Sequence, residues 1–127
     1  HLLANPIQDG GQWDMFSGIL RKYGAVPKYM MPETFHSSNT RFFVEELTHR
    51  LRKYAQILRS GHAQGKDIAA LRNEKEAFLS HVYSFLVKAL GEVPEVFDFE
   101  YYDKDKKFHK AEHLPRSNFL KTMWDGI

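Results

Sequence analysis

Cysteine is absent from the 127 residues of this chain. Its absence excludes a disulfide framework and any thiolate metal site, and it favours a reducing compartment. No apolar run approaches the roughly 20 residues that a membrane-spanning helix needs, so we expect no transmembrane segment. The net charge is only +2, which allows a basic face but does not require an anionic partner.

The composition is that of a packed globular domain. Hydrophobic residues make up 43% and aromatic residues 14% of the chain, so a buried core is expected at this length. Asp9 is placed to cap a helix that ends near Tyr23, and the aromatic stripe of that helix should pack against other elements. Residues 24–38 lack periodicity and predict an irregular loop.

Two longer helices follow, at about residues 39–59 and 68–90. Asp67 is the predicted cap of the second of these, and Gly91 its stop signal. A short polar turn joins the two helices, which predicts an antiparallel helical hairpin. The second half of residues 68–90 is apolar on two sides, so we expect it to be sandwiched between other elements.

Residues 96–102 alternate aromatic and acidic side chains, and a charged turn at residues 103–106 separates them from Phe108. This alternation predicts a β-hairpin, after which Pro115 suits the first turn of a final helix. The expected fold is therefore mainly α with a small β-hairpin (α+β). We divide the chain into residues 1–36, the helical hairpin 37–92, and the β-hairpin with the final helix 93–127.

Four segments carry the most specific pattern of this chain. They are Asp9-Gly10-Gly11-Gln12-Trp13-Asp14-Met15, Lys22-Tyr23-Gly24-Ala25-Val26-Pro27-Lys28, Met31-Pro32-Glu33-Thr34, and Phe97-Asp98-Phe99-Glu100-Tyr101 with Asp103-Lys104-Asp105-Lys106. The first three resemble a substrate-facing block of papain-like cysteine peptidases, and the last is absent from ordinary papains. Together these segments are similar to the aminopeptidase C and bleomycin hydrolase family.

The resemblance implies a long helical hairpin inserted in a papain-like fold, in an internal fragment that lacks the catalytic core strands. It also implies that Gly10 and Gly11 let the backbone approach an extended peptide substrate, and that Gln12 and Trp13 wall the pocket for the substrate's second side chain. By the same resemblance the nucleophilic cysteine lies before His1, and the catalytic histidine and asparagine lie after Ile127. We therefore assign no catalytic residue, and we expect the chain alone to be inactive.

Motifs for other chemistries are missing or incomplete. His109 and His113 stand four residues apart, but no third ligand is close in sequence, so solvated side chains are the favoured interpretation and no metal is assigned. Asp103 and Asp105 lack the glycine and glutamate of a calcium loop. No phosphate-binding Gly-rich string and no nucleophile elbow occurs, so no cofactor is expected.

The parent protein is accordingly expected to be a cytoplasmic cysteine-type aminopeptidase that removes N-terminal residues from peptides. The resemblance implies a homohexamer, with the helical hairpin as the best candidate for contacts between subunits. Two alternatives stay open. One is an independent helical interaction module. The other is a nucleic-acid groove along the basic residues of the first long helix, which are Arg41, Arg50, Arg52, Lys53 and Arg59. For these residues a solvated helix face or a subunit contact is favoured over nucleic-acid binding.

Overall fold

The chain forms two units, each with its own packing, in a computed structural model that describes residues 3–4, 6–7 and 10–126. The first unit takes His1–Asp9 and Glu33–Gly91, and the second takes Gly10–Pro32 and Glu92–Ile127. The described elements are helices α1 to α5, one 3₁₀ turn and a two-stranded sheet. The predicted fold class, mainly α with a small β-hairpin, is confirmed. The three-part division of the chain remains a prediction.

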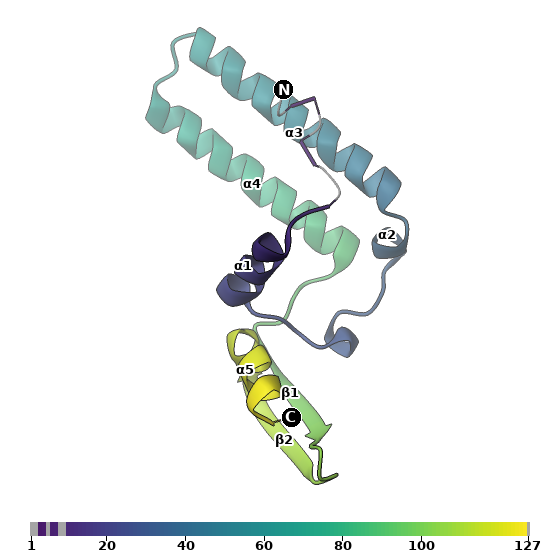
Figure 1. The fold of residues 1–127 in the computed structure, drawn as a ribbon. Coiled ribbons are helices and arrows are strands. Elements are labelled where there is room, and N and C mark those ends of the chain that lie inside the picture. Colours follow the sequence, from purple (N-terminus) through teal and green to yellow (C-terminus); the bar gives the residue numbers. More distant parts are fainter. Residues whose placement is uncertain (1–2, 5, 8–9, 127) are drawn as a thin grey trace. The chain divides into compact units, whose positions relative to one another are not determined.

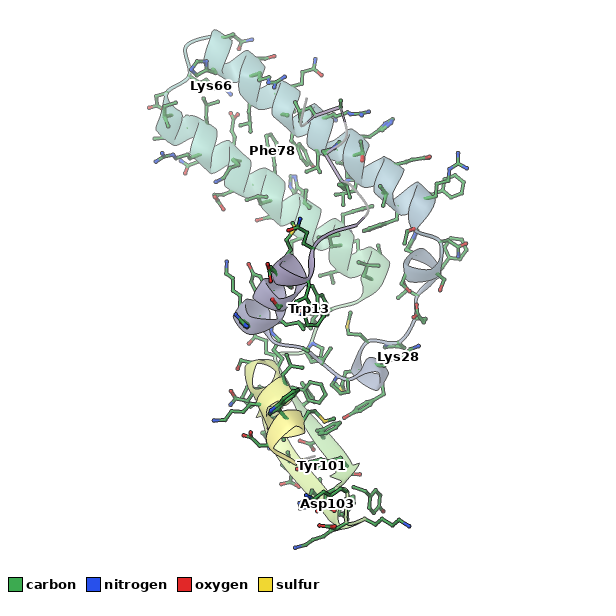
Figure 2. All side chains as sticks on the ribbon, in the orientation of Figure 1. Trp13, Lys28, Lys66, Phe78, Tyr101 and Asp103 are labelled. Carbon is green, nitrogen blue, oxygen red and sulfur yellow. The ribbon has the colours of Figure 1, made fainter. Side chains whose placement is uncertain are left out.

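The first unit is built on two long helices, α3 (Thr40–Ala63) and α4 (Ile68–Leu90), which run antiparallel side by side (Figure 1). Aromatic rings fill the space between them. Tyr54 stacks on Phe78 with 4.3 Å between ring centroids, and Phe43 stacks on Phe85 at 5.4 Å. Figure 2 shows Phe78 pointing into the space between the two helices. The predicted helical hairpin is therefore held by ring stacking across its seam.

The ends of α4 follow the predicted local signals. The Asp67 carboxylate accepts a hydrogen bond from the Ala70 backbone N–H at 2.7 Å, which satisfies one free donor of the first turn. Gly91 ends the helix at a φ of 90°, and its N–H donates to the Val87 carbonyl. Both signals act within one helical turn, which explains why the sequence alone identified them.

Two expectations for the helical hairpin were wrong. α3 continues past residue 59 to Ala63, because Gly61 is a buried helical residue and not part of the turn. A Cβ at Gly61 would lie 3.0 Å from the Lys66 side chain and 3.2 Å from that of Leu71, so glycine lets the turn fold back closely. The outer face of α4 is also uncovered by described residues, since Leu79 is 50% and Tyr83 is 60% exposed.

The segment expected as an irregular loop contains two short helical turns, a 3₁₀ turn at Lys28–Met30 and α2 at Phe35–Ser38. Thr34 caps α2: its hydroxyl accepts from the Ser37 N–H at 3.1 Å, while the Ser37 hydroxyl accepts from the Thr34 N–H at 2.9 Å. The Thr34 hydroxyl also donates to the Ala89 carbonyl at 2.9 Å and fastens α2 to the end of α4. Helical periodicity cannot reveal elements this short.

The second unit contains α1 (Trp13–Tyr23), strands β1 (Val96–Tyr102) and β2 (Phe108–Pro115), and α5 (Arg116–Gly126). The strands pair antiparallel, as the alternation predicted. The core lies on one face of this sheet, where Phe97, Phe99 and Leu114 are buried against Phe119 of α5. The Phe119 ring meets those of Phe97 and Phe99 edge-on at 5.5 and 5.0 Å. Pro115 is the last residue of β2, and the helix begins one residue later.

A β-bulge interrupts the pairing opposite Asp98. His113 adopts a φ of 52° there, and its N–H donates to the Asp98 carboxylate at 2.9 Å. The Asp98 carbonyl accepts a hydrogen bond from the Tyr29 hydroxyl at 2.8 Å. The bulge is thus tied to the 3₁₀ turn, and the segment after α1 is anchored on β1.

Candidate substrate-binding segment

Gly10 and Gly11 precede α1 and are exposed. Gly10 has a φ of 99°, which residues with a Cβ rarely adopt. Among the described residues, no hydrogen bond uses the backbone N–H or C=O of either glycine. Neither glycine has a side chain, and within the described residues their backbone N–H and C=O groups are unpaired, as a peptide-binding backbone segment requires.

The four predicted site residues lie together around one cavity of about 460 Å³: Gly10, Gly11, Gln12 and Trp13. The first turns of α1 complete its lining with Met15, Phe16 and Ile19, which the sequence analysis did not assign to the site. These three follow Gln12 at steps of three, four and seven residues, so one helix face carries all of them. From the sequence, Phe16 was interpreted as part of the packing stripe, whereas Met15 and Ile19 were assigned to neither the stripe nor the site.

The stripe of α1 does not pack as predicted. Trp13 is 74% exposed, and Phe16 and Tyr23 are also exposed. The Trp13 ring lies beside that of Phe16, at 5.6 Å between centroids, and Figure 2 shows Trp13 on the first turn of α1. The predicted cap, Asp9, lies outside the described residues. Gln12 takes the capping position without a side-chain hydrogen bond.

A second, larger cavity of about 990 Å³ lies between α1 and α5. Its apolar walls come from Trp13 and Leu20 of α1 and from Leu120, Met123 and Trp124 of α5. Three charged residues, Arg21, Lys121 and Asp125, and the hydroxyl of Ser17 also line it. The unit therefore exposes a broad apolar surface on both sides of Trp13.

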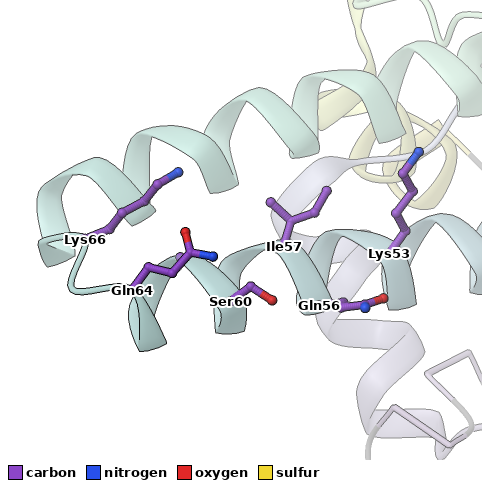
Figure 3. A pocket seen from close by; sticks show the side chains of 7 residues that line it. Lys53, Gln56, Ile57, Ser60, Gln64 and Lys66 are labelled. Carbon is purple, nitrogen blue, oxygen red and sulfur yellow. The ribbon is translucent and has the colours of Figure 1, made fainter.

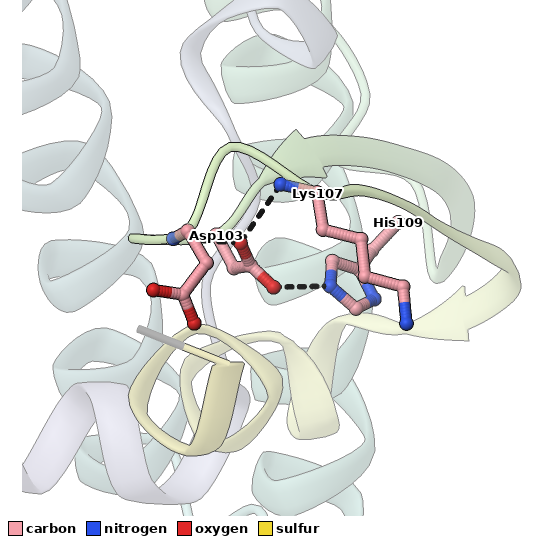
Figure 4. A network of polar contacts seen from close by, with 4 residues as sticks. Asp103, Lys107 and His109 are labelled. Carbon is pink, nitrogen blue, oxygen red and sulfur yellow. Dashed lines mark hydrogen bonds and ion pairs between the residues drawn. The ribbon is translucent and has the colours of Figure 1, made fainter.

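The hairpin tip is organised by Asp103 (Figure 4). One carboxylate oxygen accepts from the backbone N–H groups of Asp105 and Lys107, both at 2.9 Å, and the other lies 2.7 Å from His109 Nε2. The His109 hydrogen bond and then the Lys107 N–H lower the pKa of the Asp103 carboxyl. His109 also stacks on Tyr101 at 5.1 Å. His109 is therefore a paired structural residue, not the solvated side chain expected.

Metal ligation finds no support within the described part of the chain. No group of three histidine or acidic side chains there is arranged to hold an ion. His109 binds the turn carboxylate, and the backbone of His113 forms the bulge. The absence of cysteine leaves no thiol nucleophile in these 127 residues.

The basic residues of α3 are largely engaged within the chain. Arg41 pairs with Glu45 at 3.2 Å and Arg50 with Glu46 at 2.8 Å. Arg52 donates to the Leu3 carbonyl at 2.8 Å and also to that of Ala4. These pairs reduce the charge that α3 can offer to a polyanion.

Within the described residues, Lys53 and Arg59 make no hydrogen bond or ion pair, and Lys53 lines a polar cavity of about 400 Å³ near the end of the hairpin. Figure 3 shows it with the other polar side chains of the lining, Gln56, Ser60, Gln64 and Lys66. Lys66 is itself paired with Glu74. The cavity is open and mixed in polarity, and nothing about its lining favours a phosphate backbone.

Comparison with known proteins decides the family. Residues 1–125 match the Peptidase C1-like family, which covers nearly the whole chain. The chain belongs to the Peptidase C1-like family. Within it, the chain is 46% identical over 124 residues to aminopeptidase C of Listeria monocytogenes and 36% identical over 121 residues to bleomycin hydrolase of Rattus norvegicus. The resemblance to the aminopeptidase C and bleomycin hydrolase group is confirmed.

A solved structure from the same family shares the fold. PepW from Lactobacillus rhamnosis is 44% identical and matches 94% of this chain with a TM-score of 0.87. The alignments cover 98% and 95% of the chain for the two curated relatives, but only 27% of each relative's own length. The match likewise takes 27% of the PepW chain.

Among the described helices of this Peptidase C1-like chain, none combines the length and the apolar composition needed to cross a bilayer.

Proposed function

We propose that the whole protein is a cysteine-type aminopeptidase that removes N-terminal residues from peptides by thiolate acyl transfer. Relatives named aminopeptidase C and aminopeptidase E, 42–46% identical over most of the chain, support this assignment. In this proposal the present chain binds the substrate backbone and contributes no catalytic residue. The thiolate that attacks the scissile carbonyl, and the histidine that carries its proton, are supplied outside these 127 residues.

The observation that carries the binding role is the state of Gly10 and Gly11. Their backbone groups are exposed and make no hydrogen bonds within the described residues. An extended peptide laid alongside them can pair its own N–H and C=O groups with this backbone, as an added strand does at a sheet edge. The absence of a Cβ lets the two main chains come within hydrogen-bonding distance.

Gln12 and Trp13 are proposed to wall the pocket for the substrate's second side chain. Both line the cavity beside the glycines, with Met15 behind them. The Trp13 ring lies beside that of Phe16, and its bulk can narrow the cavity. We expect substitution of Trp13 by a smaller residue to admit bulkier side chains at that substrate position.

Gly11→Ala in the whole protein is the sharpest test of this role. A Cβ at Gly11 would meet only the Met15 sulfur at 4.0 Å, an ordinary contact, and its φ is not in the left-handed region. The fold should therefore tolerate the change, while a bound peptide should not. We expect kcat/KM for an aminoacyl fluorogenic substrate to fall about five- to thirtyfold, since about 1–2 kcal/mol is lost with one or two hydrogen bonds.

Gly18→Ala is the matched control, because a Cβ there meets nothing within 4 Å and Gly18 lies inside α1, away from the cavity. An unchanged kcat/KM in Gly11→Ala would contradict the backbone-binding role. Activity that survives a thiol-directed inhibitor would contradict the cysteine mechanism itself, so the two parts of the proposal fail separately.

We further propose, on the resemblance to the family, a cytoplasmic homohexamer whose helical hairpins contact one another. The exposed outer face of α4, with Leu79 and Tyr83, supports this contact. Light scattering on the whole protein should give six subunits, and Tyr83→Glu should shift the mass toward smaller species. A monomeric whole protein would refute the proposed hexamer but would not contradict the peptidase assignment.

A further inference from the structure

The groove between α3 and α4 holds a cavity of about 290 Å³, separate from the α1 segment discussed above. Residues of both helices line it: Arg50, Tyr54, His81, Ser84, Phe85 and Lys88. All six belong to the first unit, whose internal packing the two helices define. Its volume is at the lower end of ligand cavities, which suits a small molecule.

The lining combines hydrogen-bond donors with an ordered aromatic floor. Arg50, His81 and Lys88 are basic, and Tyr54 and Ser84 add hydroxyl groups. The Arg50 guanidinium lies 4.7 Å above the centre of the Phe85 ring, and the Tyr54 ring is stacked on Phe78. These contacts limit the rotamers of the donors, so less entropy is lost when a ligand orders them.

The charge of this lining is unbalanced. No carboxylate is among the residues that line the cavity in the described structure, and Glu46 is bound to Arg50. Within the described residues, the side chains of Ser84 and Lys88 make no hydrogen bond or ion pair. Ser84 and Lys88 on α4 therefore offer unpaired donors to an anion, beside an Arg50 whose charge is shared with Glu46.

We propose that this groove binds a small phosphate-bearing molecule. A phosphate group presents three terminal oxygens in different directions, which matches donors arriving from α3 on one side and α4 on the other. A carboxylate has two oxygens in one plane and can satisfy fewer of them. The Tyr54 ring provides an apolar surface for the organic part of the ligand, whereas the Phe85 ring is covered by Phe43 and by the Arg50 guanidinium.

The test is a titration of the full ¹⁵N-labelled chain with sodium phosphate, at an ionic strength held constant with sodium chloride. Phenyl phosphate and sodium acetate are the second and third probes. We expect saturable shifts of the amide resonances of His81, Ser84 and Lys88, with tighter binding of phenyl phosphate than of phosphate and little response to acetate. Lys88→Gln should weaken phosphate binding about tenfold.

Lys75→Gln is the control, because Lys75 lies on the same helix, outside the cavity, and carries the same charge. It should leave the dissociation constant unchanged. Equal weakening in both variants, or shifts that grow without saturation, would show general charge screening and overturn the site. Acetate binding as tight as phosphate would overturn the phosphate assignment. Unchanged spectra of unliganded Lys88→Gln would establish that this exposed substitution leaves the fold intact.

Discussion

Gly24 is the position where a single methyl group should do most damage to the fold. It follows α1 with a φ of 75° and a ψ of −168°, a region that only glycine occupies without strain. A Cβ at Gly24 would lie 2.2 Å from the carbonyl oxygen of Arg116, 2.5 Å from its carbonyl carbon, and 2.7 Å from the Ser117 nitrogen. These are backbone atoms at the start of α5, so they cannot swing aside as a side chain can.

The expected cost of Gly24→Ala follows from two contributions. The backbone conformation alone costs an alanine about 1–3 kcal/mol. Relief of the clash must separate residue 24 from α5, which breaks the hydrogen bond from the Ala25 N–H to the Arg116 carbonyl, now 3.1 Å long, at a further cost of about 1 kcal/mol. We therefore expect the second unit to lose about 2–4 kcal/mol of unfolding free energy.

Hydrogen exchange followed by mass spectrometry measures this effect in each unit separately. In Gly24→Ala, peptides from α1, β1, β2 and α5 should exchange faster, while those from α3 and α4 should be unchanged. Gly18→Ala is again the control: it lies within α1 without a close neighbour and should stabilise that helix by about 0.5–1 kcal/mol. If the amides of the second unit exchange equally slowly in both variants, the close contact between Gly24 and α5 is contradicted.

Three further predictions concern the hairpin tip and α2. The pKa of Asp103 in the folded chain is lowered from 3.8. Its stabilisation of the turn is therefore complete above about pH 4 and is lost as the pH falls through the lowered pKa. In His109→Ala, NMR titration of the Asp103 carboxyl should give a higher midpoint, and an unchanged midpoint would refute the pairing. Lys106 has a φ of 61°, so Lys106→Gly should stabilise the chain to urea by about 0.5–1 kcal/mol, and a loss of stability would contradict the observed turn. Thr34→Val removes both the cap of α2 and the bond to Ala89, and should cost about 1–2 kcal/mol in urea unfolding, whereas Thr34→Ser should retain most of that stability.

The parts of the fold that the sequence predicted correctly depend on neighbours along the chain. Asp67 caps α4 through an N–H three residues away, and Gly91 ends it through a carbonyl four residues back. Alternation along β1 places Phe97 and Phe99 on the buried face, because successive side chains of a strand point to opposite sides. Periodicity and capping are local, so they can be evaluated without coordinates.

The candidate site was only partly predictable for the same reason. A string of residues identified Gly10 to Trp13, and the structure places all four around one cavity. Met15 and Ile19 were missed because an apolar residue at helical spacing has the same pattern whether it packs in a core or faces a cavity. Exposure distinguishes the two, and exposure depends on which other elements lie nearby.

By itself, the sequence of this protein determined its longer helices, its β-hairpin and its family. Only the tertiary structure decided how distant residues are used: Gly24 against Arg116, Gly61 against Leu71, and the Tyr29 hydroxyl on the Asp98 carbonyl. Each of these contacts joins residues on different elements. Local backbone preferences act over a few residues, whereas close approach between elements is fixed by the packing of the whole unit.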